Sequence, residues 1–230
     1  MVWATGSNTY GQLGLGSDLK ETEVAMKIKS LKHIVQVHCG QNFSICMDID
    51  GAVFVFGQNN QGQLGTGNPE MDRFCVPIKI PAFSVGQSTA IALRTIKCGM
   101  NHICCLDKEG RAYSFGCNKY GRCGHPEDEK QLFSPKLIDI ESGAEHESNE
   151  EVKDERDTIV DIFCGNFHTI LLTKSGDYYC FGANDYGQCS TENQAKAIAI
   201  PYKVSRKELN IKGTIADVVC GFDTTVLIIQ

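Results

Sequence analysis

Histidines and cysteines are the side chains of this 230-residue sequence with the most obvious chemical potential, at six and twelve. A catalytic triad needs a nucleophile, a histidine and a carboxylate in a defined geometry, and a zinc site needs paired Cys-x-x-Cys spacing. No triad can be supported from spacing, and no Cys-x-x-Cys pair occurs. A phosphate-binding Gly-x-x-x-x-Gly-Lys stretch is absent too. We therefore expect no catalytic residue, no metal, no cofactor and no enzymatic activity of the covalent kind.

The cysteines fall into register once the sequence is aligned by its internal repeats. Four of them share one position, directly before a glycine: Cys39, Cys98, Cys164 and Cys220. Most of the other cysteines occupy positions where the other repeats have Leu, Ile or Val. Occupying apolar positions is typical of buried free thiols. No export signal precedes the first repeat, so we expect reduced thiols in an intracellular protein, cytoplasmic or nuclear. His102 and His168 align with Phe43 and Thr224, which favours packing or backbone bonding over catalysis.

Two signatures recur four times each. The first is Gly-x-Asn-x-x-Gly-Gln-Leu-Gly, which is clearest at 57–65 and begins again at Gly6, Gly116 and Gly182. The second is an apolar pair followed by Cys-Gly. From that glycine to the next turn glycine is always 11 residues, and from there to the first signature always 6. Spacing this constant predicts a rigid unit with these turn glycines: Gly6, Gly11, Gly57, Gly62, Gly116, Gly121, Gly182 and Gly187.

Each unit is typical of short β-strands. Alternating apolar runs flank a glycine turn, which predicts a hairpin, and an aromatic run then enters a Gly-x-Asn loop. A segment that starts with proline, such as 77–80, fits an outer edge strand. The extra length between units lies in 68–95 and in 139–157. Four strands in a unit of about 50 to 66 residues indicate an all-β propeller blade.

The paired signatures resemble the repeat of the regulator of chromosome condensation family over nearly the whole chain. The resemblance implies a β-propeller, which in that family has seven blades, so four repeats is a departure. It also implies one activity, guanine-nucleotide exchange on a Ran-like small GTPase. With four repeats, the exchange residues of a full ring cannot be carried over one by one. The single tryptophan argues against a light-sensing role of the plant ultraviolet-B type.

The phase of the repeats at the two ends predicts how the ring closes. The sequence opens at the aromatic strand of one unit and closes at the strand that normally precedes it. We expect one domain over 1–230, with a composite blade from 1–36 and 218–230 and further blades at about 37–95, 96–161 and 162–217. Pairing within one chain gives a four-bladed ring. Pairing between two chains gives a homodimer, because terminal strands would then be exchanged.

Two groups of residues are candidates for partner binding. Tyrosines occupy one loop position in three repeats and glutamine in the fourth: Tyr10, Gln61, Tyr120 and Tyr186. They serve either as exposed anchors or as pins for the loop. The insertion 139–157 is acidic, and it is either a solubilising loop or a contact for a basic partner through Glu145, Glu147, Glu150 and Glu151.

Charge and hydropathy narrow the classes of partner. The formal net charge is −6, which disfavours direct DNA binding, and no apolar run is long enough for a membrane span. The sequence thus predicts an interaction scaffold. The expected partner is a protein such as a small GTPase or a histone-like basic protein, and nucleotide exchange is the alternative activity.

Overall fold

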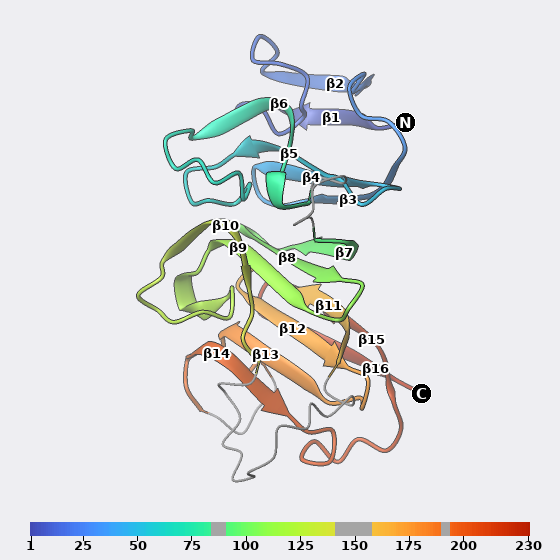
Figure 1. Ribbon diagram of the computed structural model, residues 1–230. Coiled ribbons are helices and arrows are strands. Elements are labelled where there is room, and N and C mark those ends of the chain that lie inside the picture. The colour runs from blue at the N-terminus through green and yellow to red at the C-terminus, as the bar shows by residue number, and fades with distance from the viewer. Residues whose placement is uncertain (84–90, 141–157, 190–193) are drawn as a thin grey trace.

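The computed structural model describes residues 1–83, 91–140, 158–189 and 194–230. Three four-stranded antiparallel sheets follow one another along the chain, and a two-stranded sheet flanks them at each end (Figure 1). The all-β expectation is confirmed. No helix in these ranges is long and apolar enough to cross a membrane.

Each complete sheet is one blade, with strands running in chain order from the inner to the outer edge. The first blade contains β3 Ile34–Cys39, β4 Phe43–Asp48, β5 Val53–Gln58 and β6 Arg73–Lys79. The second contains β7 Leu93–Cys98, β8 His102–Asp107, β9 Ala112–Cys117 and β10 Gln131–Leu137. The third contains β11 Ile159–Cys164, β12 His168–Thr173, β13 Tyr178–Ala183 and β14 Ala197–Val204.

The two-stranded sheets are half-blades of complementary type. β1 Trp3–Ser7 and β2 Glu21–Lys27 have the sequence pattern of the third and fourth strands of a blade. β15 Ile215–Cys220 and β16 Thr225–Ile229 have the pattern of the first and second. Two short 3-10 turns complete the set, η1 at Pro81–Phe83 and η2 at Lys119–Gly121.

The sequence pattern explains why these blades form. β4, β8, β9, β12 and β13 are central strands, and their side chains on both sheet faces are almost entirely buried. The β4–β5 turn is closed by Asp48, whose Oδ1 accepts hydrogen bonds from Asp50 N at 3.1 Å and Ala52 N at 2.8 Å. Asp107 closes the β8–β9 turn in the same way. An aspartate three residues before a glycine of positive φ is thus the local signal for the hairpin.

Large aromatic rings fill the space between blades. The last glycine of each of the first three loop signatures meets the phenylalanine of the next blade's aromatic strand: Gly14 meets Phe56, Gly65 meets Phe115, and Gly124 meets Phe181. A Cβ at Gly65 would come within 2.5 Å of the Phe115 ring. The two larger hydrophobic clusters each join neighbouring blades. The fixed signature therefore sets the distance between one blade and the next.

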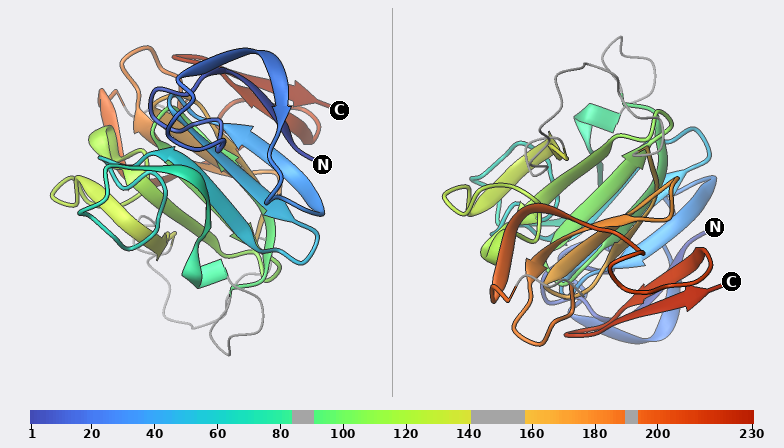
Figure 2. Two further views of the ribbon diagram at one scale, coloured as in Figure 1. Left: turned by 90° about the horizontal axis from the view of Figure 1, so that it is seen from above. Right: turned by 90° about the horizontal axis from the view of Figure 1, so that it is seen from below.

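The closed four-bladed ring predicted from the sequence is not formed. β1–β2 and β15–β16 are separate sheets at opposite ends of the stack, and no ladder between described strands joins them (Figures 1 and 2). The inner strands β3, β7, β11 and β15 pack side by side in that order. Their packing turns the chain through only part of a circle, so the half-blades do not meet within one chain. Within one chain, the strands β1–β2 and β15–β16 therefore do not form the composite blade expected from 1–36 and 218–230.

Candidate interaction surface on the motif loops

The loop of each signature is held by one buried asparagine. Asn59 Nδ2 donates to the carbonyls of Asn68 and Met71, at 3.2 and 2.9 Å, while its Oδ1 accepts from Leu64 N at 3.1 Å. Asn118 makes the fullest set, with three carbonyl acceptors and the N–H of Cys123. Asn8 and Asn184 repeat the arrangement. These bonds hold the loop rigid from inside, so its outward side chains are presented in a fixed geometry.

All eight turn glycines proposed from the sequence have positive φ, between 75° and 112°. Gly57 shows why glycine is required at such a position, because a Cβ there would lie 2.6 Å from the Cα of Phe43 on the neighbouring strand. Gly57 and Gln58 end strand β5 rather than belonging to the loop, and the β5–β6 register shifts between Val55 and Gly57. The first glycine of the signature is therefore a bulge residue.

The loops lie at the same end of each blade as the turns after the inner strands. Gln58 N donates to Asn42 O, Cys117 N to Asn101 O, and Ala183 N to Phe167 O, each at 2.9 Å. We call this end the loop end. It carries the tyrosines proposed from the sequence: Tyr10 is 39% exposed, Tyr120 37% and Tyr186 78%, whereas Gln61 is half-buried.

Tyr186 is the most exposed of these because no described strand covers its loop. In the other loops the second glycine packs against the outer strand of the next blade: Gly11 on β6, Gly62 on β10 and Gly121 on β14. Gly187 meets no described residue within 4 Å, since β15–β16 has no outer strands. The four glutamates of the acidic insertion lie outside the described residues.

One loop departs from the others at Arg122. In three loops a glutamine at this position accepts a hydrogen bond from the backbone N–H two residues earlier, Tyr10 to Gln12, Gln61 to Gln63 and Tyr186 to Gln188. Arg122 cannot accept such a bond. Tyr120 adopts a φ of 65°, which is uncommon for a residue with a side chain. Arg122 was not a candidate from the sequence, although the substitution is visible there as Gly-Arg-Cys-Gly in place of Gly-Gln-Leu-Gly.

The arginine lies among aromatic rings. Its guanidinium carbon is 4.7 Å from the centroid of Phe167 and 5.7 Å from that of Tyr120, and its Nε donates to Lys119 O at 2.9 Å. Phe222 stacks edge-on against Phe167, with the centroids 5.0 Å apart. Arg122 is 2% exposed, and burial lowers its pKa. Neither phenylalanine was a candidate from the sequence, because the two occupy adjacent turn positions rather than one repeat position.

Two histidines form hydrogen bonds between neighbouring blades. His102 Nε2 lies 2.9 Å from Thr169 Oγ1, and His168 Nε2 lies 2.8 Å from Thr225 Oγ1. Thr169 donates its hydroxyl proton to Arg122 O, so the His102 Nε2–H must be the donor in that pair. The Nδ1 atoms of both histidines are buried without a partner among the described residues. Burial lowers the pKa of His168 to about 4 and that of His102 well below the usual range.

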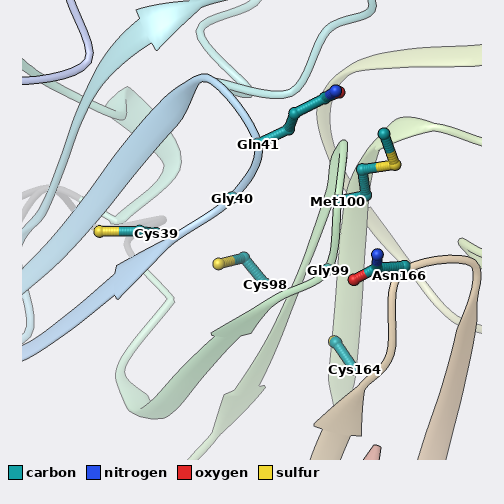
Figure 3. Close-up of a pocket in the computed structure, with 8 residues that line it drawn as sticks. All are labelled: Cys39, Gly40, Gln41, Cys98, Gly99, Met100, Cys164 and Asn166. Carbon is teal, nitrogen blue, oxygen red and sulfur yellow. The ribbon is translucent and has the colours of Figure 1, made fainter. Parts of the chain in front are cut away.

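The aligned cysteines line the concave side of the arc. Cys39, Cys98 and Cys164 border an open pocket of about 280 Å³, with Gln41, Met100 and Asn166 at its rim (Figure 3). Burial raises the pKa of Cys98. The pKa of Cys164 is raised first by the hydrogen bond that its S–H donates to Cys104 and then by burial. Both thiols are therefore protonated at neutral pH and are weak nucleophiles. Across the described ranges, no cluster of three or more His, Cys, Asp or Glu side chains is arranged to hold a metal.

Comparison with known proteins agrees with this geometry. The model of the regulator of chromosome condensation (RCC1) repeat matches residues 1–47, 50–106 and 109–172. The chain belongs to this repeat family. It is 32% identical to the RCC2 homolog of Xenopus laevis and 31% identical to human RCC2, each over 205 residues. It is 33% identical over 193 residues to the probable E3 ubiquitin-protein ligase HERC4 of Homo sapiens.

These relatives are longer proteins. The matches cover 84% of this chain but 38% of RCC2, and 83% of this chain but 16% of HERC4. The structure of Prp20p from Saccharomyces cerevisiae superposes on 99% of the chain with a TM-score of 0.77 and 18% identity, over 51% of its own length. Human WBSCR16 gives a TM-score of 0.54 at 21% identity over 67% of its length. The fold of the chain is thus an arc of an RCC1-type propeller.

Proposed function

We propose that the chain is a protein-interaction module whose partner docks on the loop end. The observation that carries this proposal is the buried asparagine in each loop, because it fixes the loop before any partner arrives. A loop held in its bound shape loses little conformational entropy on binding. Exposed tyrosines on such loops are the anchors that protein interfaces favour. An intracellular setting, cytoplasmic or nuclear, is part of the proposal, and catalysis of covalent chemistry is not.

Affinity capture from a native extract tests this proposal when two matched triple variants serve as bait. The first replaces Tyr10, Tyr120 and Tyr186 with serine at the loop end. The second replaces Asp50, Lys108 and Lys174 with alanine in the hairpin turns at the opposite end. We expect the first variant to lose the partner and the second to keep it. Equal capture by the original chain and by both variants would show that the partner does not use the loop end.

The alternative function is guanine-nucleotide exchange on a Ran-like small GTPase. It is favoured by one relative, since Prp20p is reported to bind Gsp1p and histones. The same report makes a small GTPase or a basic, histone-like protein a reasonable partner to test first. Faster release of a fluorescent guanine nucleotide from a Ran-type GTPase would support exchange. An unchanged release rate at micromolar concentrations of the chain would rule out the exchange activity.

A further inference from the structure

The loop that contains Arg122 lacks stabilising interactions that are present in the three corresponding loops of the other repeats. It lacks the glutamine bond to the loop backbone, and Tyr120 has a positive φ of 65°, a strained conformation for a residue with a side chain. It also buries a charge. Three repeats have a glutamine at this position, and the fourth has Arg122 although the arginine destabilises its loop. Such a locally unfavourable substitution points to a functional role for Arg122.

The charge of Arg122 is not neutralised within the described part of the chain. Its hydrogen bond is to a backbone carbonyl, and the three ion pairs found there all involve other residues. The groups that act on it electrostatically are Cys117, Cys123 and Tyr120, none of them a carboxylate. Lys119 adds a second cation beside the cluster, with its Nζ 4.8 Å from the Tyr120 ring centroid. A protein of net charge −6 thus places two cations together at one aromatic site.

Aromatic side chains surround these cations and reach the surface. Tyr120 and Phe167 meet edge-on at 6.3 Å, and Phe167 and Phe222 at 5.0 Å, so the rings form a continuous row from the second blade to the C-terminal half-blade. Phe222 is 56% exposed and Phe167 is half-buried. Apolar area of this kind suits a Leu or Phe side chain of a partner. The adjacent cations suit a carboxylate, and such a pair is strong in a site partly shielded from water.

We propose that Lys119, Tyr120, Arg122, Phe167 and Phe222 form a docking site for an acidic peptide segment of a partner protein. An Asp or Glu of the segment pairs directly with the exposed Lys119 and is attracted by the charge of Arg122 buried beneath the rings. A neighbouring apolar side chain lies on Phe167 and Phe222. Two cations are too few to follow a nucleic-acid backbone, so a protein ligand fits the site better. The inference rests on the proposed interaction function and assigns it a surface and a partner chemistry.

Arg122→Gln is the decisive variant, because it restores the residue found in the three sister loops. It should fold as well as the original chain, with a thermal midpoint no lower, since the Gln bond to the Tyr120 N–H becomes available. Lys108→Gln is the matched control. It removes one positive charge from the same blade, but from an exposed position in the β8–β9 hairpin turn at the opposite end.

Selection from a random peptide library supplies the probe, because it requires no identified partner. Peptides enriched on the original chain should contain Asp or Glu next to an apolar residue. Their affinity, measured by fluorescence anisotropy, should fall at least about tenfold in Arg122→Gln, stay within about twofold in Lys108→Gln, and weaken with added salt. Enrichment of neutral or basic peptides would overturn the proposal, as would equal binding by Arg122→Gln. Tighter binding of a single-stranded uridine oligonucleotide than of any selected peptide would assign the site to nucleic acid instead.

The outcome also separates this site from the wider function. A native partner captured equally by the original chain and by Arg122→Gln leaves the interaction module standing and removes only the acidic-peptide site. A chain that captures no partner contradicts the wider function, whatever the selected peptides do.

Discussion

At the residue scale, the contacts between blades change together from one repeat to the next. His102 faces Thr169 and His168 faces Thr225, whereas Phe43 and Ile103, at the same two positions, share one apolar cluster. A polar pair and an apolar pair thus fill the same position between neighbouring blades. The polar pair has a cost, because each histidine leaves its Nδ1 buried without a partner in the described structure.

The buried histidines make stability depend on pH. Burial holds the pKa of His125 and His168 at about 4 and that of His102 well below its usual range, so the folded chain resists protonation. The unfolded chain takes up protons below a pKa of about 6.5. Stability is therefore full above that pH and falls as the pH drops below it, by up to about 4 kcal/mol per pH unit for three histidines. Urea unfolding at about pH 7.5 and pH 5.5 measures this loss.

A double variant isolates one of the three contributions. His102→Phe with Thr169→Ile copies the Phe43 and Ile103 pair into the next interface. We expect the pH dependence to weaken by about one third, since one of three titrating groups is removed. An unchanged pH dependence would mean that His102 does not titrate as its burial indicates.

At the element scale, the loop depends on its asparagine more than on its length. Asn59 is 1% exposed and joins three backbone groups of the loop, whereas Asn60 beside it is exposed and makes no side-chain hydrogen bond to the described residues. We expect Asn59→Ala to lower the free energy of unfolding by about 2 to 3 kcal/mol, because buried carbonyls and an N–H lose their partner. Asn60→Ala should stay within about 0.5 kcal/mol. Denaturant titration of the two variants checks this, and equal effects would contradict the role given to Asn59.

Much of the blade could be predicted from the sequence, because its determinants are local. The 11- and 6-residue spacings reflect a hairpin and the strand after it. The turns closed by aspartate and the bulges at glycine can be recognised from the residue types at these positions. The ring closure could not be predicted, since the angle between blades depends on how rings such as Phe115 pack on the previous loop. The Phe167 and Phe222 row was missed for a similar reason. It joins two turns from different units, and a repeat alignment compares positions within units.

At the scale of the whole molecule, the two half-blades expose what complete blades bury. Val226 is 54% exposed, whereas Ile170 at the same position of the third blade is fully buried. Trp3 is 58% exposed, and its counterpart Tyr179 is 3% exposed. Both half-blades also have an open strand edge, and an open apolar edge favours pairing with another strand.

Pairing between two copies of the chain would cover the open edges of both half-blades. The arc matches about half of Prp20p, so two arcs approach a full turn, and each C-terminal half-blade could pair with the N-terminal half-blade of the other copy. We expect sedimentation velocity at micromolar concentrations to show a dimer of the 230-residue chain. Lysine in place of Val226 and Ile228 on β16 should return it to a monomer. A strict monomer of the original chain would contradict exchange of terminal strands.

Hydrogen–deuterium exchange on the captured complex tests the central proposal most directly, because it maps the partner onto the chain. If the chain is an interaction module that uses its loop end, partner binding should slow exchange in the loops 9–13, 60–64, 119–123 and 185–189 and in the turns 165–168 and 221–224. The hairpin turns 48–51, 107–110 and 173–176 at the opposite end should not change. Protection confined to those hairpin turns, or to the inner strands β3, β7 and β11 that carry Cys39, Cys98 and Cys164, would contradict the account.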